Sequence, residues 1–175
     1  TSADTKYNGL NAADVSVTNT DNDVAGITVN PTSGLTTTES GGTATFTIVL
    51  RSQPTASVTI GLTSSNTAEG TVSPASVTFT TANWSAPQTV TITGVDDAVA
   101  DGPKAYTIIT ATATSADGLY NGINPSDVSV TNNDNDVAGV TVTPTSLTTF
   151  ENGTAVTFTV VLNTQPTANV TISLS

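Results

Sequence analysis

Short runs in which apolar and polar residues alternate recur along the chain, separated by clusters of Pro, Gly and Asn. The clearest runs are 45–50, 57–62, 76–80 and 88–93, where Val, Ile, Leu or Phe take every second position and Thr fills most of the others. Successive side chains of a strand point to opposite faces, so this pattern predicts strands with one buried and one polar face. Thr, Val and Ile also favour strands by their shape.

Three further segments, 27–29, 105–112 and 127–131, extend this set to seven predicted strands. Seven short strands in little more than a hundred residues are typical of an immunoglobulin-like sandwich. No stretch of ten residues combines helical periodicity with capping signals. We therefore predict an all-β protein built from antiparallel β-sandwich domains of the immunoglobulin-like type.

The strand pattern is itself repeated. The sequence DVSVTNTDNDVAGITV at 14–29 returns as DVSVTNNDNDVAGVTV at 127–142, a spacing of 113 residues, and the offset drops to 112 after Gly34. A period of this length suits an independently folding domain better than a short solenoid repeat. A boundary after the Asp-Asn-Asp triplets divides the chain into the end of one repeat (1–23), a complete repeat (24–136) and the beginning of the next (137–175).

The partial repeats bear on how the chain assembles. Two such chains joined end to end would still lack the counterpart of residues 64–113, which argues against polymerisation by strand exchange. We therefore expect a piece of a longer tandem polypeptide, whose first partners are the neighbouring repeats of the same chain. Like chains in a surface assembly are a further expected partner.

Composition narrows the possible chemistry. The chain has three Lys and Arg residues and 14 Asp and Glu residues, which gives a net charge of -11. So few cationic side chains argue against a nucleic-acid partner. The chain has no Cys and no His, which leaves carboxylates as the reactive groups. No apolar run approaches the roughly 20 residues that cross a bilayer, and no signal peptide begins at Thr1.

The acidic residues gather at predicted turns and strand ends. Glu39 lies in TESGGTATFTIVL, Asp96, Asp97 and Asp101 lie in GVDDAVADGPKAYTI, and Asp134 and Asp136 close the repeat. On these motifs the whole repeat resembles the Calx-β family, sandwich domains named after the regulatory domains of sodium/calcium exchangers and found in many large bacterial surface proteins. The resemblance implies calcium ligands at Glu39, Asp97, Asp101, Asp134 and Asp136, with Asp96 binding or orienting beside them.

The same resemblance includes departures. Glu69 only loosely matches a family signature, Asn135 replaces an acid in the closing run, and Gly-Pro-Lys follows Asp101 where further acids are usual. These differences imply fewer or more weakly bound ions.

The carboxylates favour a cation on physical grounds as well. Two carboxylates about 5 Å apart repel by roughly 3 kcal/mol at an effective dielectric constant near 20, so a cluster of four or five is unfavourable without a counter-ion. Oxygen ligands in a flexible site select calcium over magnesium. The alternative is a solvated acidic surface without any ion. An EF-hand is excluded at residues 21–32, because Ala25 and Thr32 occupy positions that should carry ligands.

Smaller signals have both functional and structural interpretations. Trp84, the only Trp, could stack on a sugar, but we expect it to close one end of the sandwich. Asn83, Asn152 and Asn169 lie in glycosylation sequons, which also arise by chance in a Thr-rich chain. Lys104 and Lys6 could form isopeptide bonds, although Leu119 replaces Lys6 in the other copy. Tyr7 and Tyr120 are expected to pack a loop near the junction between repeats.

Three classes of function follow from these features. The one we favour is a secreted or cell-surface, calcium-binding structural repeat that acts as a rigid spacer in an adhesin, surface layer or filament, because identical units add equal increments of length. The alternative is a carbohydrate-binding module built on Trp84, Tyr7 or Tyr120. An enzyme is disfavoured, since the adjacent Asp96 and Asp97 would point in opposite directions in an extended strand.

Overall fold

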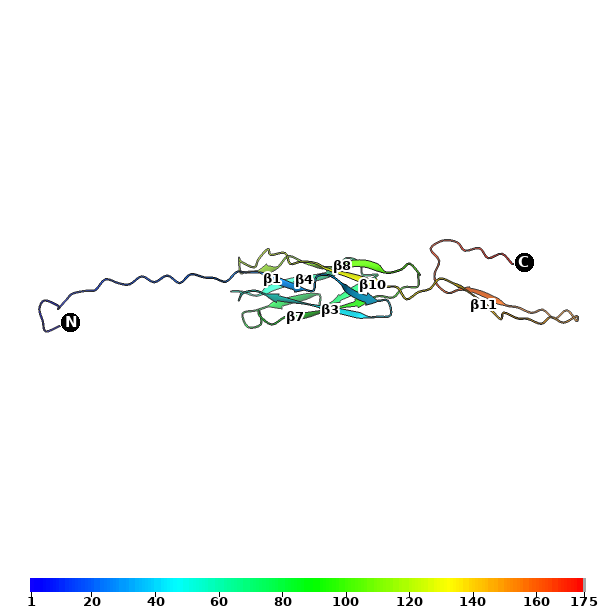
Figure 1. Cartoon of the computed structure of the whole chain (residues 1–175), viewed down its shortest axis with the longest axis horizontal. Helices are drawn as coiled ribbons and strands as arrows, with labels where there is room; N and C mark the ends of the chain where they lie inside the picture. Colours follow the sequence, from blue (N-terminus) through cyan, green and yellow to red (C-terminus); the bar gives the residue numbers. More distant parts are fainter. Residues whose placement is uncertain (175) are drawn as a thin grey trace.

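The computed structural model describes residues 1–174 and contains strands but no helix in that range. A central sandwich is built from residues 27–133, with an extended segment before it and a two-stranded hairpin after it, so that the three lie roughly along one line (Figure 1). The prediction of an all-β fold is confirmed. None of the described residues belongs to a helix long and apolar enough to cross a bilayer.

The first sheet of the sandwich has the order β1-β3-β7-β5 and is antiparallel throughout. Its strands are β1 (Ile27–Asn30), β3 (Thr43–Leu50), β5 (Gly70–Ser73) and β7 (Gln88–Gly94). Of these, β5 is not predicted from the pattern, because Gly70–Ser73 contains a single apolar residue, Val72.

The second sheet has the order β2-β10-β8-β4-β6, with the short β9 paired to β4. Its strands are β2 (Leu35–Thr38), β4 (Val58–Ser64), β6 (Ser76–Phe79), β8 (Lys104–Thr110), β9 (Thr114–Ser115) and β10 (Val128–Asn133). All neighbours are antiparallel except β2 and β10, which run parallel with Leu35 opposite Val130 and Thr38 opposite Asn133. This single parallel pair joins the beginning of the domain to its end.

The core lies between the two sheets and is filled by every second residue of each long strand. Phe46, Ile48 and Leu50 of β3 meet inward-facing residues of the opposite sheet such as Ile60 and Ile108. Their neighbours along each strand, mostly threonines, face solvent or lie at the sandwich margin. The alternation in the sequence therefore identifies the buried face correctly.

The turn between β1 and β2 explains the change of offset between the two copies. Gly34 lies there with a φ of 77°, a left-handed conformation that favours glycine. The second copy lacks this residue, so the one-residue difference falls in a surface turn, where the strands on either side can keep their pairing.

After the sandwich, β11 (Val140–Thr143) and β12 (Thr159–Leu162) form a separate two-stranded sheet. Val140 pairs with Leu162, which matches the pairing of Ile27 with Leu50 between β1 and β3. The hairpin thus reproduces the first pairing of the sandwich with the corresponding residues of the second copy.

Candidate metal centre

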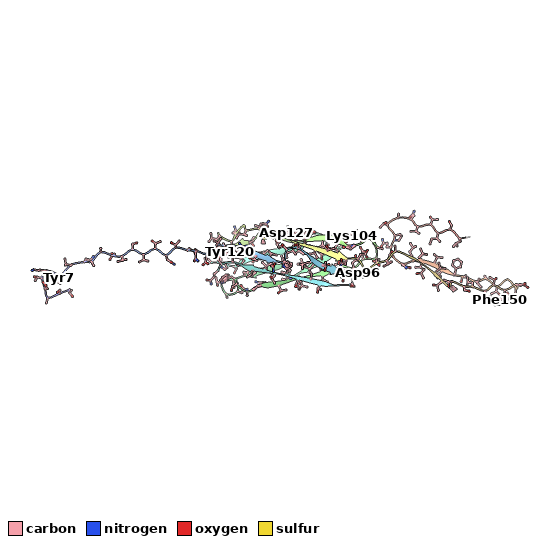
Figure 2. All side chains as sticks on the ribbon, in the orientation of Figure 1. Tyr7, Asp96, Lys104, Tyr120, Asp127 and Phe150 are labelled. Carbon is pink, nitrogen blue, oxygen red and sulfur yellow. The ribbon has the colours of Figure 1, made fainter. Side chains whose placement is uncertain are left out.

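The predicted acidic residues meet at one end of the sandwich. Glu39 directly follows β2, the loop 95–103 connects β7 to β8, and residues 134–136 directly follow β10. Because β2 and β10 are parallel and in register at Thr38 and Asn133, the residues after both strands emerge side by side. Asp96 marks this end of the sandwich in Figure 2, with Tyr120 at the opposite end.

Three of the predicted ligands form a compact cluster. Glu39, Asp134 and Asp136 each place one carboxylate oxygen within 4.8 Å of the others. Glu39 is buried, while Asp134 and Asp136 are half-buried. One oxygen of Asp136, Oδ2, is inaccessible to solvent and has no hydrogen-bond partner among the described residues. A buried carboxylate oxygen without a donor is unfavourable, and a cation is a natural partner for it.

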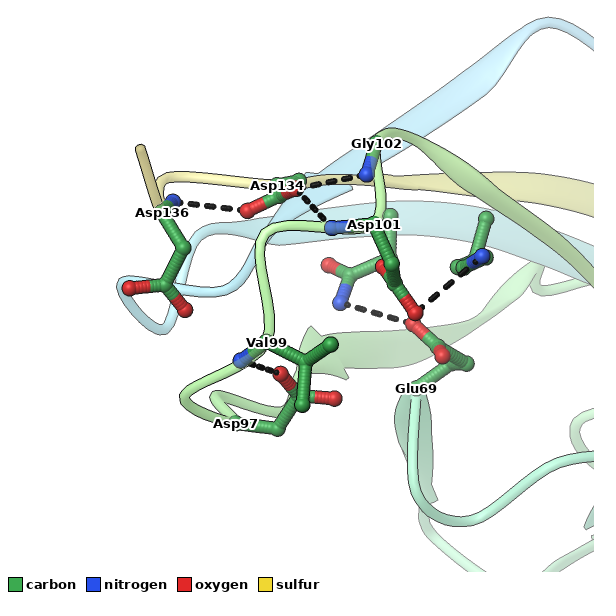
Figure 3. Close-up of polar contacts among 9 residues, drawn as sticks. Glu69, Asp97, Val99, Asp101, Gly102, Asp134 and Asp136 are labelled. Atoms are coloured by element: carbon green, nitrogen blue, oxygen red, sulfur yellow. Dashed lines mark hydrogen bonds and ion pairs between the residues drawn. The ribbon is translucent and has the colours of Figure 1, made fainter. Parts of the chain in front are cut away.

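Backbone amides hold the middle carboxylate in place. Asp134 Oδ2 accepts hydrogen bonds from the N–H groups of Asp101 (2.9 Å) and Gly102 (2.6 Å), as Figure 3 shows. Its other oxygen, Oδ1, accepts one from the N–H of Asp136 at 2.6 Å. These backbone hydrogen bonds keep the pKa of Asp134 below its ordinary value, so this carboxylate is ionised whenever the chain is near neutral pH.

The two flanking carboxylates are in the opposite electrostatic situation. Burial raises the pKa of Glu39, and the charges of Asp134 and Asp97 raise it further, against one hydrogen bond from the N–H of Asn135 at 3.1 Å. Burial also raises the pKa of Asp136, followed by the charges of Asp134, Asp96, Asp97 and Asp101. Burial and neighbouring charges therefore disfavour the ionised forms of Glu39 and Asp136, and a positive ion beside them would favour those forms.

Asp96 and Asp97 form an exposed outer layer. Asp97 Oδ1 accepts a hydrogen bond from the N–H of Val99 at 2.7 Å, which shapes the loop (Figure 3). Asp96 Oδ1 accepts one from the Nδ2 of Asn135 at 3.2 Å. The amide that replaces an acid in the closing run is thus used to tie Asp96 to residues 134–136.

The structure places Asp101 and Glu69 apart from the three-carboxylate cluster. The Asp101 carboxylate forms an ion pair with Lys104 at 3.1 Å, and only its backbone N–H reaches Asp134. Glu69 is buried beneath the cluster, where its Oε2 accepts a hydrogen bond from Asn132 Nδ2 at 3.4 Å (Figure 3). The positive charge of Lys104 therefore partly compensates the negative charge of Asp101.

A buried polar network under the site was not foreseen from the sequence. Asn132 accepts a hydrogen bond from Thr37 Oγ1 (2.9 Å) and donates to the C=O of Val95 (3.0 Å), and Thr37 also contacts the hydroxyl of Tyr106. The network joins β2, β10 and the 95–103 loop below the carboxylates. A signal was present, because Asn132 continues the inward series of Val128 and Val130 and so puts an amide at a core position.

The smaller candidates occupy structural positions. Trp84 is half-buried against the core, and its C=O accepts a hydrogen bond from the N–H of Leu50 at 3.2 Å. Asn83 uses its side chain to hold the turn after β6, accepting from the N–H of Thr80 at 2.6 Å. Tyr120 is buried and Tyr7 is exposed. Lys6 is exposed in a turn near the N-terminus, and Lys104 forms an ion pair with Asp101.

Comparisons with known proteins give structural neighbours only, since no family model and no curated protein matches the chain. The apo form of the Calx CBD1 domain is 15% identical, with a TM-score of 0.48, covering 63% of this chain and 96% of that one. WR4, an MSP family member of C. elegans, is 17% identical with a TM-score of 0.42, covering 62% of this chain and 96% of that one. Domains 4 and 5 of the S-layer protein SbsC are 27% identical with a TM-score of 0.35, covering 65% of this chain and 53% of that one.

These neighbours are β-sandwich proteins. We assign the β-sandwich architecture of this chain from its own strand order and core.

Proposed function

We propose that the repeat unit 24–136 binds calcium at the end of its sandwich where β2 and β10 finish. The observation that carries the proposal is the buried Asp136 Oδ2, which lacks a donor and lies within a cluster completed by Glu39 and Asp134. Hard oxygen ligands without nitrogen or sulfur suit calcium or magnesium, and carboxylates on flexible loops favour the larger and geometrically more tolerant calcium.

The acidic residues at this end of the sandwich would surround such an ion as an inner group of direct ligands and an outer, exposed group. Glu39, Asp134 and Asp136 would hold it directly, while Asp96 and Asp97 add charge from the exposed loop and are close enough to raise the pKa of Asp136. The charge of Asp101 is already partly offset by Lys104, which pairs with its Oδ2. An ion at this place would offset the repulsion that the buried carboxylates experience without it.

The proposed role of the unit is structural: a calcium-stiffened spacer in a secreted or cell-surface assembly such as an adhesin, surface layer or filament. The supporting feature is position, because Asp136 precedes β11 by only three residues and the candidate site therefore lies at the joint to the next unit. A joint that holds uncompensated negative charge is expected to be mobile, and an ion shared by its two sides would restrict it. The proposal requires no enzymatic activity.

Small-angle scattering on a chain of three or more units tests this role. With millimolar calcium we expect an extended rod, and with chelator we expect a smaller and more variable maximum dimension. Isothermal titration of the same sample separates binding from stiffening. Heat of binding with no change in dimension would reject the spacer mechanism alone, whereas no heat and no shift in Tm would reject the calcium site.

A further inference from the structure

The loop at the end of the sandwich makes a direct backbone contact with the segment after β12. The N–H of Gln165 donates a hydrogen bond of 2.7 Å to the C=O of Ala98. A hollow of about 520 Å³ lies beside this bond, with Val99 and Ala100 on the sandwich side and Pro166 and Ala168 among the residues on the other. In Figure 1 the chain after β12 returns toward the end of the sandwich before it runs to the C-terminus.

The same four residues occur at the opposite end of the sandwich. Gln165-Pro166-Thr167-Ala168 repeats Gln53-Pro54-Thr55-Ala56, 112 residues earlier. Gln53 is exposed, and its backbone N–H donates to no acceptor within residues 1–174. The donor that is engaged after β12 is therefore free at the corresponding position of the sandwich.

This head loop, residues 51–56, is held firmly by its own domain. The N–H of Thr55 donates to Asp117 Oδ2 at 2.7 Å. The N–H of Ser52 donates to the Tyr120 hydroxyl at 3.0 Å, and that hydroxyl donates to the C=O of Ser52 at 2.6 Å. Asp117 and Tyr120 are buried, so the loop loses little conformational freedom when it meets a partner.

The charges of the two loops favour contact between the head loop of one unit and the 95–103 loop of another. Arg51, one of three cations in the chain, is exposed in the head loop, while the loop around Ala98 carries Asp96, Asp97 and Asp101. The head loop of one unit thus carries a positive charge, and the 95–103 loop of another carries negative charges, so the two loops attract each other. At the joint after β12, Asn163 takes the place of Arg51, so the backbone contact forms there without this charge.

We propose that the head loop of each unit docks on the Ala98–Ala100 loop of the unit before it, so that the partner of the exposed Gln53 is a second copy of this unit. The contact consists of one backbone hydrogen bond, with the half-buried Ala56 beside it on the head loop. Pro54 is buried in its own unit, unlike its exposed counterpart Pro166, and makes no part of the contact. The contact needs no metal and is additional to the calcium site, and it fixes which face of one sandwich meets the next.

Paired cysteines test the contact in the 175-residue chain, which has no natural Cys. With the N–H of Gln165 bonded to the C=O of Ala98 at 2.7 Å, backbone bond lengths limit the separation of the two Cα atoms to about 6.6 Å, within the range of a disulfide. Ala98→Cys with Gln165→Cys should therefore close an intramolecular disulfide at least tenfold faster than the control Ala98→Cys with Asn152→Cys, whose second site lies in the exposed turn of the hairpin. Equal rates for the two pairs would overturn the contact. Because the assay gives this readout in chelator as well, its failure is distinguishable from failure of calcium binding.

The partner of the head loop is tested between chains. A chain with Ala98→Cys and Gln165→Pro, which removes the competing N–H, is mixed with a chain carrying Gln53→Cys. Mass spectrometry should show several-fold more mixed disulfide than with Thr63→Cys, an exposed position on β4. Equal capture of the two positions would overturn the assignment of a second copy as the partner.

Discussion

Residues 14–19 and 127–132 have the same sequence, Asp-Val-Ser-Val-Thr-Asn, but they adopt different structures. In the second copy they form most of β10, where Val128 and Val130 are 0% and 2% exposed. In the first copy no strand forms, and Val15 and Val17 are 86% and 85% exposed. The local sequence cannot account for this difference.

The difference is explained by the partners available to each copy. β10 pairs with β2 on one side and β8 on the other, and it buries both valines between the sheets. Residues 14–19 have no strand beside them within the described chain. The hairpin β11–β12 is intermediate, since the described residues 137–174 supply both members of that pair but no opposite sheet. An alternating pattern thus specifies a strand only where tertiary partners exist.

The largest effect that would sharpen this comparison is expected at corresponding phenylalanines. Phe46 is 1% exposed in the core, whereas its counterpart Phe158 is 43% exposed. Phe46→Ala should lower the free energy of unfolding by about 3–5 kcal/mol, because it removes a buried ring and leaves a cavity. Phe158→Ala should change it by less than about 0.5 kcal/mol. Urea denaturation followed by Trp84 fluorescence measures both, and similar losses would contradict the assignment of the core.

The acidic residues allow the same comparison for calcium. Asp136 and its counterpart Asp23 both donate their N–H to an aspartate two residues earlier, but only Asp136 lies beside a buried glutamate. At 100 times the Kd, calcium should stabilise the wild-type domain by about 2.7 kcal/mol, or roughly 10 °C in Tm. Asp136→Asn should weaken calcium binding at least tenfold, and Asp23→Asn should leave it unchanged. Isothermal titration checks both variants, and equal loss would place the site elsewhere.

A smaller effect is expected at the tyrosines. The Tyr120 hydroxyl bonds to both the N–H and the C=O of Ser52, while the counterpart Tyr7 is exposed. Tyr120→Phe should cost about 1–2 kcal/mol, because it leaves buried backbone groups of Ser52 without partners. Tyr7→Phe should cost nothing measurable. Thermal unfolding in calcium compares the two variants. An unchanged Tm for Tyr120→Phe would contradict the conclusion that the Tyr120 hydroxyl stabilises the head loop through Ser52.

The smallest effect is a change in pH dependence without calcium. The pKa values of Glu39 and Asp136 are raised above 4.5 and 3.8, so the folded chain binds these protons more tightly than the unfolded chain. In chelator, stability should therefore increase as the pH falls from 7 through the raised pKa values. It should decrease again below about 4, where Asp134, with its lowered pKa, loses the hydrogen bonds that stabilise its charge.

Saturating calcium should remove that acidic maximum, because the ion stabilises the ionised carboxylates. Tm measured between pH 3 and 8 with calcium and with chelator gives the comparison. A Tm in chelator that falls steadily from pH 7 to 5 would contradict the assigned electrostatics.

Much of the fold could be predicted from period-two alternation, since each of the seven predicted segments contains or overlaps a strand of the sandwich. The strands β2 and β5 could not be predicted from this alternation, because Leu35–Thr38 and Gly70–Ser73 each contain only one apolar residue. They are strands because β10 and β7 offer them hydrogen bonds. Thr37, a buried hydroxyl in β2, finds its partner in Asn132, which is 95 residues away.

The site was only partly accessible from sequence for a similar reason. The family resemblance names Glu39, Asp134 and Asp136, and the structure brings these three together. Their convergence depends on the parallel pairing of β2 with β10, which no local spacing reveals. The ion pair of Asp101 with Lys104 also follows from how the 95–103 loop enters β8, so sequence alone could not separate Asp101 from the inner cluster.

The parallel pairing of β2 with β10 has a mechanical consequence. When a tandem chain is pulled from its two ends, tension that reaches β2 acts toward the N-terminus and tension on β10 acts toward the C-terminus. In a parallel pair these forces slide the strands along each other, so the pairs from Leu35–Val130 to Thr38–Asn133 carry the load together instead of opening one at a time. The unit is thus held together between its second and its last strand by hydrogen bonds that are loaded in shear.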